Sequence, residues 1–178
     1  QSRGLGDVYK RQELRDRIIV KATEAFTAHG IKSITMDDIA TSLGISKRTL
    51  YEVFVDKESL LKDCILTVQA ERDRYLQEVY EQSHNVLEVI LAVFQKSIEM
   101  FHKTNKRFFE DIKKYPKAYA LMTNRHNQDS EETVNFFKEG VKQGIFRDDV
   151  NFAIINLLVR EQIDVLMNTD ICKEYSFL

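Results

Sequence analysis

Apolar residues recur at helical spacing along most of the chain. One face of residues 13–29 carries Leu14, Ile18, Ala22, Ala25 and Phe26, which predicts an amphipathic helix that Gly30 ends. The same spacing predicts further helices over 36–43, 47–54, 57 to beyond 79, 86–102, 106–114, 116–142 and 150–167. Because no stretch sustains the alternation of a strand, the sequence predicts an all-α fold.

Capping residues mark the starts of the two shortest predicted helices near the N-terminus. Thr35 precedes the first, with Asp38 three residues on as its capping-box partner, and Ser46 precedes the second. Gly44 lies between them and can adopt a positive φ without a Cβ clash. Two short helices joined in this way form a helix-turn-helix, whose second helix enters the major groove of DNA. Its expected core residues are Ile39, Ala40, Leu43, Ile45, Leu50 and Phe54.

This segment resembles the TetR/AcrR family of regulators. The matching positions are Thr35, Ile39, Ala40, Gly44, Ile45, Ser46, Thr49, Leu50, Tyr51, Phe54, Lys57, Glu58 and Leu61, all in register with the family signature. The resemblance implies a three-helix DNA-binding domain followed by a helical bundle. It also implies a ligand-responsive transcriptional regulator, most often a repressor that a small-molecule effector releases from its operator, acting as a homodimer.

Three parts of the chain follow from this pattern. Residues 1–12 show no apolar stripe and do not open with Met, so we expect a disordered or non-native leader. Residues 13–57 are the predicted helix-turn-helix domain. Residues 58–178 are the predicted effector-binding and dimerisation domain, which we expect to be C-terminally truncated because only one strongly apolar final helix precedes the end at Leu178.

The start of the second short helix supplies most of the candidate DNA contacts. In that helix Lys47, Arg48 and Thr49 come first, where side chains meet base edges and phosphates, and Tyr51 lies one turn further on. The full set of candidates is Thr35, Ser46, Lys47, Arg48, Thr49, Tyr51 and Lys57. Each has a simpler reading: Thr35 and Ser46 as helix caps, Tyr51 as a core aromatic, and Lys57 as a solvated charge. Family members often carry Gly where this chain has Arg48.

Large aromatic and Met side chains are frequent between residues 94 and 137, and they suggest an apolar effector pocket. The candidates are Phe94, Phe101, His102, Phe108, Tyr119, Met122 and Phe137, with His126 as a further polar group. Ordinary core packing is the alternative for each of them. The final predicted helix is apolar on several sides, at Ile154, Ile155, Leu158 and Val165 among others, and we expect it to form the dimer interface.

Charge and composition narrow the function further. The chain has a net charge of −2, and residues 13–57 carry seven basic and seven acidic side chains, so DNA binding must depend on where the charges lie. Cys64 and Cys172 show no metal-ligand spacing, and no segment resembles a signal peptide or a membrane span. Asp37 and Asp38 fit the first turn of a helix better than a catalytic pair.

These features predict a cytoplasmic regulator without a cofactor or a metal. Two alternatives remain at this point. One is an enzyme on an all-α scaffold, which no nucleophile–base grouping or phosphate loop supports. The other is a helical protein-interaction module with a non-functional helix-turn-helix. The presence of Lys47, Tyr51 and Lys57 in the family's register argues against this alternative.

Overall fold

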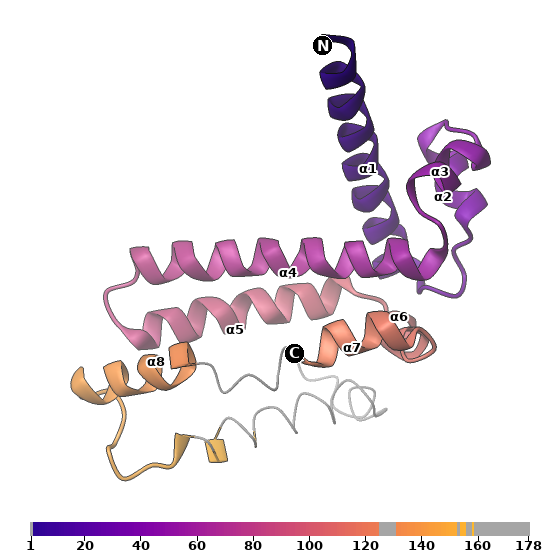
Figure 1. The fold of residues 1–178 in the computed structure, drawn as a ribbon. Coiled ribbons are helices and arrows are strands. Elements are labelled where there is room, and N and C mark those ends of the chain that lie inside the picture. The colour runs from indigo at the N-terminus through magenta and orange to yellow at the C-terminus, as the bar shows by residue number, and fades with distance from the viewer. Residues whose placement is uncertain (1, 125–130, 153, 156–157, 159–178) are drawn as a thin grey trace. The chain divides into compact units, whose positions relative to one another are not determined.

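The computed structural model describes residues 2–124, 131–152, 154, 155 and 158. Within these residues all regular structure is helical, as the sequence predicts. The helices labelled in Figure 1 are α1 (Ser2–His29), α2 (Met36–Leu43), α3 (Lys47–Val53), α4 (Lys57–Gln82), α5 (Val86–Lys103), α6 (Lys106–Ile112), α7 (Pro116–Asn124) and α8 (Glu131–Lys142).

The predicted boundaries around the helix-turn-helix are confirmed. Thr35 and Asp38 form a complete capping box at α2, and the Ser46 side chain accepts from the amide of Thr49 at α3. Gly30 and Gly44 have φ of 88° and 66°, the left-handed region that glycine enters without a Cβ penalty. The capping residues and the two glycines therefore define these ends locally.

Residues 2–12 differ from the sequence expectation of a disordered leader, because they are the first turns of α1. Their side chains from Gly6 onward are exposed, so packing does not explain the helix. The following residues of α1 pack into the core and are already helical. Extending an existing helix adds a hydrogen bond per residue without the cost of nucleation, which accounts for helix over a stretch that has no apolar stripe.

The C-terminal part tests the sequence expectation only where it is described. Residues 116–142 were expected as one helix; the structure describes helix over Pro116–Asn124 (α7) and Glu131–Lys142 (α8), and residues 125–130 lie outside the described residues. The last helical residues described are 152, 154, 155 and 158. The amide of Ile154 donates to the side chain of Asn151 at 3.3 Å, whereas Asp149 accepts from the Arg147 side chain at 2.8 Å. Residues 159–167 of that predicted helix lie outside the described residues.

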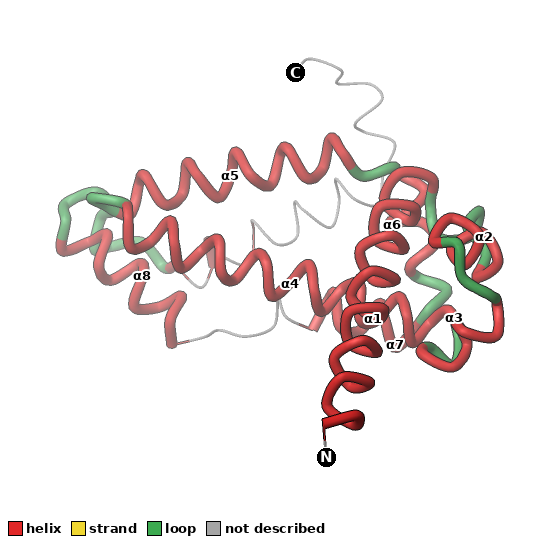
Figure 2. Tube along the Cα trace, turned by 90° about the horizontal axis from the view of Figure 1, so that it is seen from above, coloured by secondary structure: helices red, strands yellow, loops and turns green. Residues whose placement is uncertain are grey.

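The chain divides into two compact units. The first comprises Gln1–Glu71 and Lys103–Met122, and the second comprises Arg72–His102 and Thr123–Leu178. This division differs from the expected boundary after Lys57, since α6 and α7 belong with the helix-turn-helix. Figure 2 shows α6 near the end of α1 in this unit.

The core of the first unit draws on α1, α2, α3, α4, α6 and α7. It is built around the fully buried Phe26, Leu50 and Leu61. The remaining buried members are Ile18, Ile19, Ala22, Ile31, Met36, Ile39, Ala40, Phe54, Leu60, Cys64, Ile65, Ile112 and Ala118. Because α6 and α7 contribute to the same core as the recognition helix, the first unit is more than a DNA-binding head alone.

The second unit is organised around phenylalanine rings. The ring of Phe137 on α8 stacks on Phe152 with centroids 4.6 Å apart, and both rings contact Phe146. Gly140 lies beneath this cluster, where a Cβ would overlap the Phe146 ring. The amide of Val86, at the start of α5, donates to the Gln143 side chain at 3.0 Å, which ties α5 to the end of α8.

Candidate nucleic-acid interface

The helix-turn-helix has one buried face and one exposed face. Leu50 of α3 has an exposed fraction of 0% and contacts the same core as Ile39 and Ala40 of α2. On the opposite face of α3, Lys47, Arg48 and Tyr51 are exposed. Helix α3 therefore presents the predicted base-reading residues to solvent, as a recognition helix requires.

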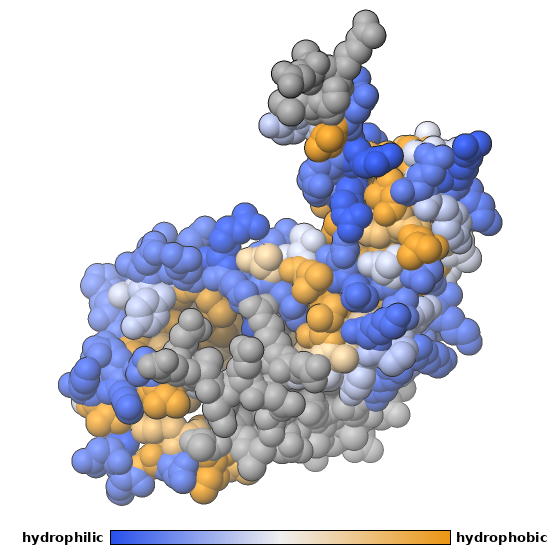
Figure 3. All heavy atoms as spheres, viewed as in Figure 1, coloured by the Kyte–Doolittle hydropathy of each residue, from blue (hydrophilic) through white to orange (hydrophobic). Residues whose placement is uncertain are grey.

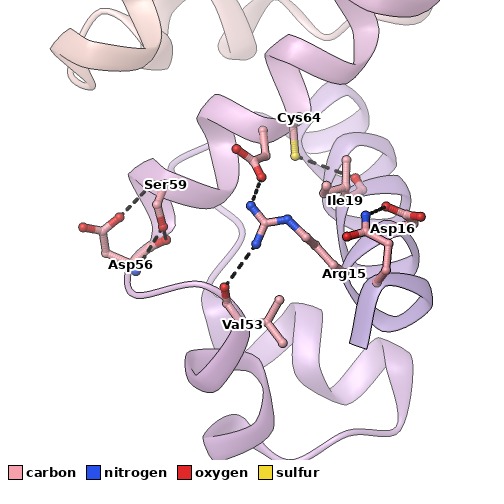
Figure 4. Close-up of polar contacts among 9 residues, drawn as sticks. Arg15, Asp16, Ile19, Val53, Asp56, Ser59 and Cys64 are labelled. Atoms are coloured by element: carbon pink, nitrogen blue, oxygen red, sulfur yellow. Dashed lines mark hydrogen bonds and ion pairs between the residues drawn. The ribbon is translucent and has the colours of Figure 1, made fainter. Parts of the chain in front are cut away.

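Arg15 of α1 fixes the position of α3. Its guanidinium forms an ion pair with Asp63 of α4, donates to the carbonyl of Val53 at 3.5 Å, and lies 4.5 Å from the centroid of the Phe54 ring. Figure 4 shows the Arg15 side chain reaching towards the Val53 carbonyl. The sequence pattern did not single out Arg15, since one charge on an amphipathic helix gives no signal of its partner.

Buried Cys64 lies beside this contact on α4 (Figure 4). Its thiol approaches the carbonyl of Ile19 at 3.7 Å. Burial raises the pKa of the Cys64 thiol to about 11, so the thiolate that redox or metal chemistry needs is not formed near neutral pH. Cys64 is thus a packing residue here, as its isolated position in the sequence suggested, while Cys172 lies outside the described residues.

The two capping hydroxyls are engaged within the protein. The Thr35 hydroxyl donates to the Asp38 carboxylate at 2.6 Å, and the backbone amide of Thr35 donates to it at 2.7 Å. These hydrogen bonds hold the pKa of Asp38 below its usual value. The Ser46 hydroxyl lies 2.8 Å from that of Thr49. Their role as helix caps is therefore present in the structure, and a phosphate contact remains a prediction for both.

Both basic residues that open α3 are already in ion pairs. The Lys47 ammonium lies 2.9 Å from the Asp37 carboxylate of α2, and hydrogen bonding to Asp37 raises the pKa of Lys47. The Arg48 guanidinium lies 3.0 Å from Glu52, one turn along α3. These pairs were not expected from the sequence.

Tyr51 and Thr49 complete the predicted contact surface. Tyr51 is 42% exposed, which excludes the alternative that it is a core aromatic. Thr49 is half-buried beside the Ser46 cap. The Tyr51 phenol is thus accessible as a hydrogen-bond donor on the same helix as Lys47 and Arg48.

Lys57 makes contacts within the protein, and its role as a phosphate contact stays a prediction. Its ammonium donates to the carbonyl of Ile31 and lies 5.7 Å from the centroid of the Phe26 ring. Partial burial lowers the pKa of Lys57, an effect that the nearby Asp111 and Asp38 oppose. In this structure Lys57 joins the start of α4 to the turn after α1.

Helix α6 is attached to the same turn. Asn105, the residue that caps α6, donates from its backbone amide to Thr27 at 2.7 Å and from its side chain to Ala28 at 3.1 Å. Asp111 of α6 accepts from the backbone amide of Lys32 at 2.7 Å. The last carbonyls of α1 therefore find their donors on α6 instead of in solvent.

The expected effector residues are divided between the two units. Phe108, Tyr119 and Met122 pack against the core of the first unit. The others lie in the second unit, with Phe94 63% exposed on α5 and Phe137 inside the phenylalanine cluster. Phe101 and His102 are exposed near the end of α5, and His126 lies outside the described residues. On the face drawn in Figure 3, hydrophobic residues reach the surface between hydrophilic ones.

Within the described residues, no three His, Cys, Asp or Glu side chains are grouped so that they could hold a metal ion. No helix of the described part of the chain is both long and apolar enough to cross a membrane.

Known proteins resemble this chain in sequence and in fold. Residues 18–64 match the family model described as "Bacterial regulatory proteins, tetR family". The HTH-type transcriptional regulator UidR of Escherichia coli K12 is 27% identical over 172 residues, which cover 93% of this chain and 88% of UidR. The repressor KstR2 of Mycolicibacterium smegmatis is 24% identical over 152 residues, which cover 83% of this chain and 74% of KstR2.

Solved structures show the same fold. The fatty acid degradation regulator FadR from Bacillus halodurans has a TM-score of 0.65 at 16% identity, covering 92% of this chain and 87% of FadR. The ketosteroid transcriptional regulator KstR2 of Mycobacterium tuberculosis has a TM-score of 0.58 at 21% identity, covering 83% of this chain and 78% of KstR2. Over residues 18–64 the chain thus carries a helix-turn-helix of the TetR-family type, and over most of its length it resembles bacterial transcriptional regulators in sequence and in fold.

Proposed function

We propose that this protein is an operator-binding repressor whose DNA contacts come from Lys47, Arg48, Thr49 and Tyr51 of α3. The observation that carries this proposal is the exposed face of α3 opposite the buried Leu50. Side chains on that face reach the base edges when the helix lies in the major groove. Lys57 contributes by positioning, because its ammonium is held by the Ile31 carbonyl.

A homodimer supplies the second recognition helix. A single short helix reads too few base pairs for an operator, and a two-fold dimer places its recognition helices about one DNA turn, ~34 Å, apart. Ile154, Ile155 and Leu158 are 54%, 40% and 53% exposed in the single chain. These side chains are the proposed centre of the dimer interface, since a pairing face of this kind is apolar.

A small-molecule effector is proposed to release the protein from DNA. Phe94 and Phe101 of α5 offer exposed aromatic surface for such a ligand. Helix α6 shares the turn after α1 through Asn105 and Asp111. A ligand that binds differently to two arrangements of the helical body would shift the protein towards the form with weaker operator affinity.

Selection of duplexes from a random pool tests DNA binding directly. We expect the purified protein to enrich a palindromic site with half-sites about one helical turn apart. A Lys47→Gln, Arg48→Gln double variant, altered only at exposed side chains, serves as the matched control and should lose the enrichment while keeping its thermal unfolding temperature. A wild-type protein that enriches no sequence would support the alternative of a protein-interaction module with a non-functional helix-turn-helix.

A further inference from the structure

Each of the two cations at the start of the recognition helix forms an ion pair with a carboxylate. The Lys47 ammonium lies 2.9 Å from one oxygen of Asp37 and 3.0 Å from the other. The Arg48 Nε donates to Glu52 at 3.0 Å. In the first pair the side chains of Lys47 and Asp37 are 61% and 58% exposed. The cations are thus accessible to DNA, but each has a negative partner at contact distance before DNA arrives.

Asp37 differs in its contacts from the acid beside it. Asp38 completes the capping box with Thr35 and so stabilises α2 itself. Asp37 takes no part in that box, and its carboxylate contacts Lys47 of the next helix instead. The dipole of α2 favours any acid in its first turn, yet it does not account for the contact with Lys47.

The ion pair has a larger consequence for DNA binding than for folding. Exposed ion pairs add little to stability, with typical values of about 0–1 kcal/mol. Non-specific DNA affinity, in contrast, comes from cations that meet phosphates and displace their counterions. A carboxylate at 2.9 Å from Lys47 competes with a phosphate for the same ammonium and also repels the phosphate.

The charge balance of the helix-turn-helix region leaves little to compensate for this competition. Residues 13–57 contain seven basic and seven acidic side chains. With no surplus of positive charge, each cation that is withdrawn from the phosphates removes a large part of the electrostatic attraction to DNA of any sequence.

We propose that Asp37 is a specificity-determining residue. Its ion pair with Lys47 prevents Lys47 from contacting the phosphates of non-cognate DNA, and this ion pair breaks only where an operator contact replaces the carboxylate. Glu52 does the same for Arg48. On operator DNA, base-edge contacts along α3 hold the helix close enough for the exchange of partner. On other DNA those contacts are missing, and the ion pair persists. This inference rests on the proposed function, because it presupposes operator binding.

The test is the near-isosteric substitution Asp37→Asn. Binding is measured across a range of KCl concentrations to the duplex enriched from the random pool and to a duplex of fixed random sequence. We expect affinity for the random duplex to rise roughly threefold to tenfold, with a steeper salt dependence by about one unit per recognition helix. Operator affinity should rise less, so that the ratio of the two affinities falls. Glu52→Gln should act in the same direction and gives a second, independent variant.

Two controls separate the ion pair from a general change in charge. Glu24→Gln removes one acid from another exposed pair, with Lys21 on α1, at 3.5 Å, and should change random-duplex affinity much less. In a Lys47→Gln background, Asp37→Asn should give a much smaller gain, because the cation that it would free is absent and only the repulsion between carboxylate and phosphate is relieved. Thermal unfolding of each variant checks that α2 remains folded.

The possible results distinguish this inference from the proposed function. Equal gains for operator and random duplexes, a gain as large for Glu24→Gln, or a gain that is undiminished in the Lys47→Gln background would each overturn the role of Asp37 while leaving a DNA-binding repressor. A wild-type protein that selects no duplex would overturn the proposed function and the role of Asp37 together.

Discussion

Two different roles are expected for Lys57, one from the sequence and one from the structure. Its place in the family's register predicts a phosphate contact, whereas its ammonium donates to the Ile31 carbonyl and lies over Phe26. Removing a charged donor from a buried or half-buried acceptor lowers the free energy of unfolding by roughly 1–2 kcal/mol. The two roles have different experimental signatures.

Lys57→Ala should therefore lower the thermal unfolding temperature and leave the salt dependence of random-DNA binding unchanged. The loss of stability follows from the unsatisfied Ile31 carbonyl. Lys62→Ala, at a half-buried position of α4 for which no contact to that carbonyl is seen, is the control. A salt slope reduced by about one unit with unaltered stability would instead assign Lys57 to a phosphate.

Thr35 is expected to matter through its cap. Removing the side chain in Thr35→Ala should destabilise the protein by about 1 kcal/mol, as measured by urea unfolding near neutral pH. Thr41→Ala, at an exposed position of the same helix, should cost nothing because alanine favours helix.

The stability that this cap contributes should also depend on pH. Since hydrogen bonds from Thr35 depress the pKa of Asp38, their contribution is present above the ordinary value of 3.8 and is lost as the pH falls through the lower folded value. The difference between wild type and Thr35→Ala should shrink in that acid range. A constant difference at all pH values would show that Asp38 is not the partner that matters.

At the scale of elements, Asn105 joins two helix ends. Its side-chain oxygen accepts from the Arg107 amide at the start of α6, and its side-chain nitrogen donates to the Ala28 carbonyl at the end of α1. Asn105→Ala removes both hydrogen bonds and should cost about 1–2 kcal/mol of unfolding free energy. Asn105→Asp keeps the cap of α6 and loses the donor to α1, so its unfolding free energy should lie between those of the wild type and Asn105→Ala. Equal stability of all three proteins would contradict the dual role.

Replacing Gly140 by alanine should have the opposite effect on stability from a usual Gly→Ala substitution in a helix. In α8, Gly→Ala would normally gain about 0.5–1 kcal/mol, but a Cβ at Gly140 would overlap the Phe146 ring. Gly140→Ala should therefore destabilise the second unit, as followed by hydrogen exchange of the α8 amides. Gly6→Ala on α1, where nothing lies within 4 Å, should show the normal small gain or no change.

At the scale of the whole molecule, the proposed dimer would decide whether α3 can bind an operator. Leu158 is 53% exposed and lies near Ile154 and Ile155 along the last described helix. Leu158→Glu should dissociate the dimer, because a two-fold interface receives the new charge twice. Operator affinity should be lost with it, although α3 is unchanged. Analytical ultracentrifugation measures the first effect and a shift assay the second.

The control for this substitution is Val20→Glu, at an apolar residue of α1 that is 55% exposed in the first unit. It should leave the dimer intact. A wild-type protein that is monomeric at micromolar concentration and still binds its operator would refute the assembly argument, as would a Leu158→Glu protein that remains dimeric.

Local chemistry in the sequence determined the all-α class, the helix-turn-helix and its capping residues. A cap such as Thr35 or a left-handed Gly44 acts on backbone groups within four residues, so its effect can be deduced from neighbouring letters. The same locality made the exposed positions of α3 predictable, since the apolar side of a short helix implies the polar side.

Contacts between distant residues were decided only by the tertiary structure. Lys57 and Ile31, Arg15 and Asp63, or Lys47 and Asp37 meet because three-dimensional packing brings separate helices together. Helical periodicity shows that a side chain faces outward, but it does not name the partner that side chain finds on another helix. For this reason the sequence identified the recognition helix, and the structure revealed which of its charges already have partners.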